Sequence, residues 1–185
     1  MHNRAEAHIN LQAITRNVEL LKKKSGTDLL AVVKADAYGH GLVPVAKRAL
    51  KAGATWLGVA LMEEAITLRQ SGVSAPILAW LTPITDDFSS ALENEIDIAI
   101  PSLAHLAAVL QAAQTTKRIP RIHLEVDTGM SRGGALLEWN ELVSAAGAAE
   151  KNGSLKVIGI WSHFARADEP GHEFNLQQRE TFERA

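Results

Sequence analysis

The sequence of 185 residues contains no cysteine, a single tyrosine and no large excess of either charge. Without cysteine, the chain cannot form disulfides, thiolate nucleophiles or cysteine-ligated zinc sites. A net charge of −2 gives no electrostatic attraction to nucleic acid or to an anionic membrane surface. No apolar run reaches the roughly 20 residues of a membrane-spanning helix, and the opening MHNRAEAHIN lacks the apolar core of a signal peptide. These absences predict a soluble, cytoplasmic protein that binds neither nucleic acid nor membrane.

What the sequence does contain is a regular alternation of apolar runs and amphipathic stretches. Hydrophobic residues make up 46% of the chain and charged residues 22%, a balance typical of a globular protein. Apolar runs predict buried strands at 29–34, 56–61, 76–81, 96–100, 122–126 and 157–163. Helical periodicity lies between them, at 11–24, 43–52, 63–70, 88–94, 102–114, 136–151 and from 174 onward.

Repeated strand–helix units predict an α/β fold with a parallel sheet covered by helices. A doubly wound open sheet would be complete with this number of strands. A (β/α)8 barrel of the TIM type needs eight strands and about 250 residues, so it would be incomplete here, with about six of the eight. Periodicity alone leaves both architectures open. In the barrel case, two strand edges would lack their neighbours.

Three polar residues lie at or just beyond the C-terminal ends of predicted strands. Lys34 ends the first apolar run, Arg132 follows a strand through the turn DTGMSR, and His163 ends the last strand. Both α/β architectures place their active sites at this edge of the sheet. The three residues are therefore candidates for one active site.

The segment after Lys34 changes the balance between two interpretations of that residue. A lysine at a strand end is usually a solvated boundary residue. Here it is followed by ADAYGHG, in which Tyr38 can donate a hydrogen bond to a phosphate and the glycines allow a close backbone approach. A lysine with a lowered pKa is the nucleophile that forms an imine with a carbonyl cofactor. The segment therefore favours a site in which Lys34 binds a phosphorylated carbonyl cofactor.

Residues 31–41, AVVKADAYGHG, resemble the pyridoxal-phosphate attachment signature of bacterial alanine racemases. The later segments VDTGMSR at 126–132 and SHFARAD at 162–168 resemble motifs of the same family in the same order. The resemblance thus spans essentially the whole chain. It implies one truncated domain over 1–185, the N-terminal pyridoxal-phosphate-binding barrel, without the C-terminal β-domain of the family.

The resemblance also implies roles for these residues. Lys34 would hold pyridoxal 5′-phosphate as an aldimine and exchange the α-proton on the D-alanine side, and Tyr38 would contact the cofactor phosphate. Arg132 would lie near the cofactor's phenolic oxygen and the substrate carboxylate, while His163 would pack against the pyridine ring. The reaction would interconvert L- and D-alanine in the cytoplasm, supplying D-alanine for the cell wall.

Racemisation by two bases needs a second acid/base group on the opposite face of the substrate. In the family this is a tyrosine from the C-terminal domain of the partner subunit, so the resemblance implies a homodimer. Tyr38 is the only tyrosine of this chain and is assigned to the phosphate. We therefore expect the 185-residue chain to hold half of a racemase site and to be inactive alone.

Two positions depart from the family pattern. Asp36 stands where asparagine is common, and its carboxylate would favour the charged form of Lys34. Glu125 stands where many members have a carbamylated lysine, and strand alternation places it on the inward face with Asp127. Two interpretations of Glu125 stay open: it orients Arg132 as an anion, or it is an ordinary inward polar residue.

Other functions remain alternatives. The chain could belong to a serine racemase or one of broad specificity, to a non-catalytic pyridoxal-phosphate-binding protein, or to an inert racemase fragment. Non-catalytic proteins of that kind do not usually carry the AYGHG continuation or the DTGMxR turn. No residues show metal-ligand spacing, so no metal is expected, and the isolated histidines His105 and His123 are predicted to be structural.

Overall fold

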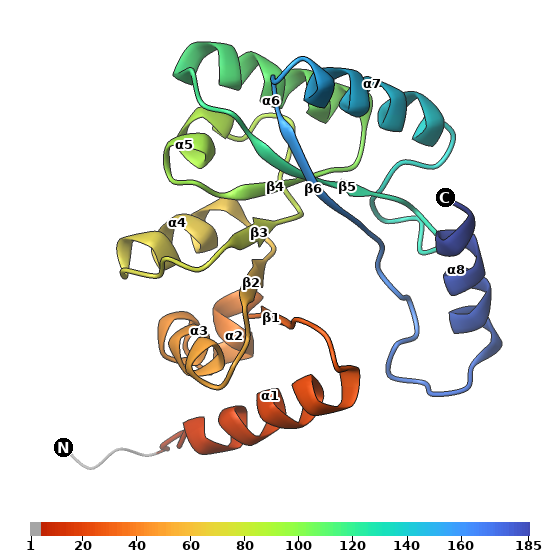
Figure 1. Cartoon of the computed structure of the whole chain (residues 1–185). Helices are drawn as coiled ribbons and strands as arrows, with labels where there is room; N and C mark the ends of the chain where they lie inside the picture. The colour runs from red at the N-terminus through yellow and green to blue at the C-terminus, as the bar shows by residue number, and fades with distance from the viewer. Residues whose placement is uncertain (1–4) are drawn as a thin grey trace. The chain divides into compact units, whose positions relative to one another are not determined.

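The computed structural model describes residues 5–185 (Figure 1). Over this range the strands are β1 (Leu30–Val32), β2 (Trp56–Val59), β3 (Ile77–Ala79), β4 (Asp97–Ile100), β5 (Arg121–Glu125) and β6 (Lys156–Trp161). The helices are α1 (Leu11–Ser25), α2 (Lys34–Gly39), α3 (Leu42–Lys51), α4 (Met62–Gln70), α5 (Phe88–Glu93), α6 (Leu103–Thr116), α7 (Trp139–Lys151) and α8 (Glu173–Arg184).

The strands form one sheet in the order β1-β2-β3-β4-β5-β6. The pairs β1/β2, β4/β5 and β5/β6 are parallel. A doubly wound sheet reverses its strand order at a switch point, whereas a (β/α)8 barrel adds strands in chain order. The observed order therefore confirms the barrel architecture, and its two ends, β1 and β6, are those of an incomplete barrel.

The predicted elements recur with shifts of at most three residues at their ends, and two differences bear on the site. The first strand ends at Val32, so Lys34 lies beyond the strand and opens a separate turn, α2, that periodicity did not predict. Helix α7 begins at Trp139, three residues later than predicted, and Leu136 and Leu137 are exposed in the loop before it. Both differences concern segments that leave the sheet at its C-terminal edge.

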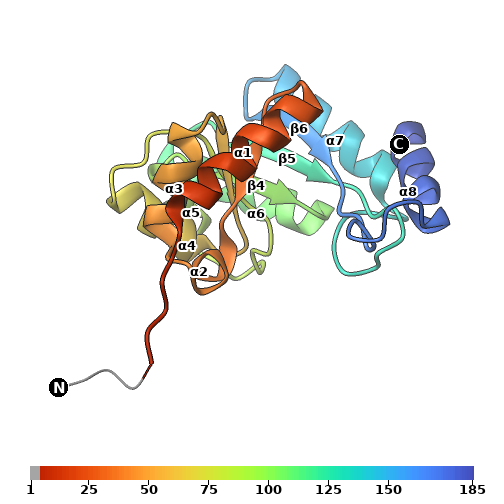
Figure 2. The same ribbon diagram turned by 90° about the horizontal axis from the view of Figure 1, so that it is seen from below.

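The chain divides into two compact units, one up to Leu78 and one from Ala79 onward. In the first unit, the Asn10 side chain accepts a hydrogen bond from the Ala13 N–H and so caps α1. Val18, the buried residue of α1, packs against Ala49 of α3, and Figure 2 shows α1 alongside α3. Helix α3 in turn contacts both β1 and β2.

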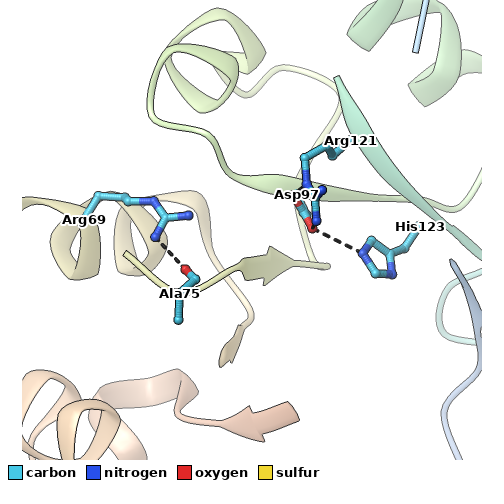
Figure 3. Close-up of polar contacts among 5 residues, drawn as sticks. All are labelled: Arg69, Ala75, Asp97, Arg121 and His123. Atoms are coloured by element: carbon cyan, nitrogen blue, oxygen red, sulfur yellow. Dashed lines mark hydrogen bonds and ion pairs between the residues drawn. The ribbon is translucent and has the colours of Figure 1, made fainter. Parts of the chain in front are cut away.

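The first unit also fixes the chain that leads into β3. Arg69, in the last turn of α4, donates hydrogen bonds from Nη1 to the carbonyl oxygens of Val73, at 2.8 Å, and Ala75, at 2.6 Å. Figure 3 shows the bond to Ala75. A cation at a helix C-terminus also complements the negative end of the helix dipole. Arg69 therefore holds the α4–β3 connection.

In the second unit, the residues of β4 are all buried, and helices α6 and α7 lie together over the strands (Figure 1). Ile98, Ile100 and Ile122 are fully buried between strands and helices. Alternation along β5 places Ile122 and Leu124 in this core and leaves His123 and Glu125 on the opposite face, as predicted.

A buried charge cluster lies at the N-terminal starts of β4 and β5 (Figure 3). Asp97, 1% exposed, accepts two hydrogen bonds from Arg121, from Nε at 2.7 Å and Nη2 at 3.1 Å, and its Oδ2 lies 3.4 Å from His123 Nε2. The hydrogen bond to Asp97 raises the pKa of the Arg121 guanidinium. This end of a barrel serves stability rather than catalysis. The contact supports a structural role for His123.

Candidate active site

Lys34 lies two residues beyond the end of β1 and opens a turn of left-handed backbone conformation. Ala35, Asp36, Ala37 and Tyr38 have φ angles of 55°, 54°, 52° and 54°. This is one turn of left-handed helix made without glycine, and it costs roughly 1–2 kcal/mol per residue for L-amino acids. The turn therefore stores about 4–8 kcal/mol of backbone strain, which surrounding contacts must offset.

Glycines and backbone hydrogen bonds support the far end of the turn. Gly39 and Gly41 continue with positive φ, at 79° and 93°. The Gly41 N–H donates to the Asp36 carbonyl at 2.9 Å, and a Cβ at Gly41 would lie 2.8 Å from Cγ of Pro44. Glycine is therefore required at 41 by the turn and by the start of α3.

Glu64 holds the near end of the turn. Its Oε1 accepts a hydrogen bond from the Ala35 N–H at 2.5 Å, and its Oε2 accepts from the N–H groups of Ala60 and Leu61, both at 3.0 Å. One carboxylate thus joins the residue after Lys34 to the chain that leaves β2. Sequence reasoning missed Glu64, whose visible signal was its position in the first turn of a predicted helix.

Asp36 has a partner that its place in the sequence did not reveal. Its Oδ1 accepts a hydrogen bond from the N–H of Leu42, the first residue of α3, at 2.6 Å. The side chain therefore ties the left-handed turn to α3. An asparagine Oδ1 can accept the same bond, so a carboxylate and a carboxamide are interchangeable in this role.

Lys34 and Tyr38 lie together at this turn. The Nζ of Lys34 is 5.7 Å from the centroid of the Tyr38 ring. Lys34 is half-buried, whereas Tyr38 is 70% exposed. The turn thus presents a primary amine and a phenol side by side, a nucleophile beside a hydrogen-bond donor.

The loop after β5 carries Arg132 and is closed by its own backbone. Val126 forms a bridge with Ala135, the Ala135 N–H donates to the Glu125 carbonyl at 2.8 Å, and the Asp127 N–H donates to the Ala135 carbonyl at 3.0 Å. A Cβ at Gly134 would lie 2.6 Å from the Asp127 nitrogen, so this position requires glycine. The exposed Arg132 is presented from a closed loop.

The Asp127 side chain orders the turn inside that loop. Its Oδ1 accepts hydrogen bonds from the N–H groups of Gly129, at 2.9 Å, and Ser131, at 3.1 Å. Ser131 has a φ of 57°, a left-handed conformation that such side-chain bonds stabilise. Asp127 thereby fixes the backbone just before Arg132.

Glu125 is buried beside this turn, at 5% exposure. Burial raises the pKa of its carboxyl from 4.5 to about 7, the charge of Arg132 lowers it, and the charge of Asp127 raises it. Within residues 5–185, the ion pairs closer than 4.0 Å do not include Glu125 and Arg132. The positive charge of Arg132 thus acts on Glu125 without a direct contact.

The loop after β6 carries His163, whose Nδ1 lies 2.8 Å from the Phe164 carbonyl oxygen. Gln178 of α8, only 1% exposed, anchors this loop. Its Nε2 donates to the His163 carbonyl and to Thr128 Oγ1, both at 3.0 Å, and its Oε1 accepts from the Ala165 N–H at 2.9 Å. Gln178 therefore joins the loop of Arg132 to the loop of His163, a link that sequence reasoning missed.

A cavity of about 440 Å³ opens beside this junction. Its lining is mostly apolar and includes Thr128, Trp161, Ser162, Phe164, Gln178 and Phe182. Within the described part of the chain, no group of three histidine, aspartate or glutamate side chains is arranged to hold a metal ion. The polar chemistry instead belongs to the two sets of loops at the C-terminal ends of the strands.

The predicted site residues thus fall into two groups. Lys34 and Tyr38 lie together in the first unit. In the second unit, Glu125 and Arg132 interact electrostatically, and Gln178 connects their loop to that of His163. The convergence of the two groups on one cofactor stays a prediction.

Comparison with known proteins decides the family. Residues 9–185 match the family model of the alanine racemase N-terminal domain. The chain belongs to the alanine racemase family. It is 45% identical over 179 residues to an alanine racemase of Salinispora tropica, covering 96% of this chain and 48% of that protein. It is 46% identical over 187 residues to one of Thermobifida fusca, covering 100% and 50%. The chain therefore spans about half the length of these relatives.

Solved structures agree with the sequence comparison. The crystal structure of alanine racemase from Streptomyces lavendulae superposes with a TM-score of 0.92 at 43% identity, over 95% of this chain and 47% of that one. A histidine racemase from Leuconostoc mesenteroides superposes with a TM-score of 0.83 at 29% identity, over 98% and 50%. The fold of this half is thus similar in racemases named for different amino acids.

Proposed function

We propose that this chain is the cofactor-binding half of an alanine racemase and that it holds pyridoxal 5′-phosphate on Lys34. The observation that carries the proposal is the left-handed turn after β1, in a chain of this family. It places the Lys34 amine and the Tyr38 phenol together and is anchored by the carboxylates of Glu64 and Asp36. A strained backbone held by specific contacts is typical of functional sites.

The side chains present fit this cofactor. The Lys34 amine can bond covalently to an aldehyde carbon, and the Tyr38 hydroxyl can donate to a phosphate oxygen. The Arg132 guanidinium suits a phenolic oxygen and a carboxylate, and the His163 imidazole can pack on an aromatic ring. When bound, pyridoxal 5′-phosphate supplies a conjugated ring that withdraws electrons from the α-carbon of an amino acid.

Within such a site, the residues of this chain bind, orient and move a proton. Arg132 would bind the substrate carboxylate. Asp127 fixes the backbone of the loop just before Arg132, so fewer positions are open to the guanidinium. Lys34 would hold and return the α-proton at Nζ on the D-alanine side. The opposing base would come from outside this chain, from the partner subunit of a homodimer.

Glu125 would act in this site as an anion near Arg132. With a pKa of about 7, its carboxyl is about half ionised at neutral pH. The charge of Arg132 favours the ionised form, and the ionised form in turn favours a guanidinium that stays close. Glu125 would therefore bias Arg132 through its charge at a distance rather than through an ion pair.

The proposed substrate is alanine, interconverted between its L and D forms in the cytoplasm. A different amino-acid substrate is the alternative. A protein named histidine racemase has the same fold over this half, so the fold is compatible with a substrate other than alanine. Within residues 5–185, no helix is long and apolar enough to cross a membrane.

A chimera tests the proposed activity. The chain would be fused to the C-terminal half of the Thermobifida fusca relative, and D-alanine formed from L-alanine would be measured with added pyridoxal 5′-phosphate. We expect racemisation by the chimera, none by the chain alone, and none by the chimera carrying Lys34→Ala. A folded, dimeric chimera that racemises serine or histidine but not alanine would contradict the proposal that alanine is the substrate. Racemisation by the chain alone would contradict the proposal that this chain holds only half of the catalytic site.

A further inference from the structure

The Glu64 carboxylate bridges two segments that are far apart in the sequence. Ala60 and Leu61 leave β2, whereas Ala35 lies 29 residues before Glu64 and follows Lys34. The Oε1 oxygen serves Ala35 and the Oε2 oxygen serves the other two N–H groups. Both oxygens are therefore in use, and both accept.

Helix capping explains only part of this arrangement. A glutamate in the first turn of α4 that accepts from the Leu61 N–H makes half of a capping box, and the Ala60 bond extends it. The Ala35 bond contributes nothing to α4. It instead fixes Ala35, the first residue of the left-handed turn. Without such a restraint, an alanine would favour a negative φ.

We propose that Glu64 is a positioning residue for Lys34. Glu64 holds the left-handed turn and so sets the direction of the Lys34 amine. The proposal rests on the proposed function, because the amine needs a fixed direction only if it bonds to a cofactor. A backbone rotation at Ala35 would redirect the adjacent Lys34 side chain. Misplacement of a reacting group by about 1 Å can slow a reaction by about 100-fold.

Three variants separate the bridge from the cap. Glu64→Gln keeps the size of the side chain but only one accepting oxygen, which the two N–H groups of Ala60 and Leu61 favour, so its NH2 group, which cannot accept, faces Ala35. Glu64→Asp keeps the charge but is one methylene shorter, so it can cap α4 while losing its reach to Ala35. Glu63→Gln is the control, because Glu63 is the exposed neighbour in the same helical turn.

Amide hydrogen exchange in the cofactor-free chain tests the hold on the turn. We expect Glu64→Gln and Glu64→Asp to speed exchange at Ala35 by about tenfold or more, since a charge-assisted hydrogen bond is lost. Exchange at Ala60 and Leu61 should stay slow in Glu64→Asp, and all three amides should be unchanged in Glu63→Gln. Equal exchange at Ala35 in wild type and both Glu64 variants would overturn the proposal.

The rate of covalent attachment tests the effect on Lys34. Each variant is mixed with pyridoxal 5′-phosphate, quenched with borohydride at set times, and digested so that adduct on Lys34 is counted by mass. We expect attachment to be about 10- to 100-fold slower in both Glu64 variants than in Glu63→Gln.

The outcomes distinguish the two proposals. Slowing in Glu64→Gln but not in Glu64→Asp would mean that the cap is sufficient, and it would overturn the assignment to Lys34. A folded wild-type chain without adduct on Lys34 would contradict the proposed function. The exchange at Ala35 would then still decide whether Glu64 holds the turn.

Discussion

The Glu125 carboxyl and the Arg132 guanidinium interact through their charges without forming an ion pair. Burial raises the pKa of the Glu125 carboxyl, the charge of Arg132 lowers it, and the charge of Asp127 raises it. The net result is a pKa of about 7 for a carboxyl that is 5% exposed. A group that titrates near neutral pH makes the stability of its surroundings depend on pH.

The direction of that dependence follows from the raised pKa. Between pH 4.5 and about 7, the folded chain keeps a proton on Glu125 that the unfolded chain releases. The free energy of unfolding should therefore fall as the pH rises through this range, by on the order of 2 kcal/mol after allowance for solvent screening. Glu125→Gln should match wild type at pH 4.5 and be more stable by that amount at pH 8.

Urea unfolding of both proteins at the two pH values measures this difference. Glu180→Gln, at an exposed position on α8, is the control and should leave the pH dependence of wild type unchanged. A gap between wild type and Glu125→Gln that does not change with pH would contradict the raised pKa.

Asp36 gives a second prediction, because its partner is a backbone N–H rather than Lys34. Asp36→Asn keeps an accepting oxygen and should change the free energy of unfolding by less than about 0.5 kcal/mol, whereas Asp36→Ala should cost about 1 kcal/mol. Thermal or urea unfolding distinguishes them. If asparagine is as harmful as alanine, the charge of Asp36 matters and the capping role is insufficient.

The third prediction concerns Gln178, the buried residue of α8 that joins two loops. Gln178→Leu removes the hydrogen bonds to the His163 carbonyl, the Ala165 N–H and Thr128 Oγ1, and it leaves Thr128 with only its bond to Ser162 Oγ. The cost should be about 2–3 kcal/mol in the free energy of unfolding. Gln177→Leu, at the exposed neighbour on α8, should cost less than about 0.5 kcal/mol. Equal effects of the two substitutions would show that the buried bonds contribute little.

The Asp97 cluster should affect stability but not chemistry, because Asp97 and Arg121 lie at the N-terminal starts of β4 and β5, the end of barrel strands that serves stability. Asp97→Ala leaves the Arg121 guanidinium without its buried partner and should cost about 2–3 kcal/mol, less than for a fully buried pair because Arg121 is 40% exposed. Asp28→Ala, at an exposed site, is the control. At a pH and temperature where both are folded, attachment of cofactor to Lys34 should be the same.

The strands and the helices other than α2 were predictable because apolar periodicity is a local signal, and the strand ends in turn located Lys34, Arg132 and His163. The hand of the turn at 35–38 was not, since alanine and tyrosine have no preference for positive φ. Glu64 and Gln178 could not be found either. Glu64 binds Ala35, 29 residues away, and Gln178 binds Thr128, 50 residues away, and only the folded chain brings these pairs together. The two missed residues act through other groups, which leaves no motif in the sequence.

The site of cofactor attachment can be measured directly. The purified chain is mixed with pyridoxal 5′-phosphate, reduced with borohydride and digested, and the modified peptide is identified by mass. We expect one major adduct, on Lys34, and its loss in Lys34→Ala. Lys47, an exposed lysine on α3 in the same unit, serves as the internal reference for non-specific labelling. Equal labelling of Lys34 and Lys47, or an adduct that survives Lys34→Ala, would contradict the assignment of Lys34.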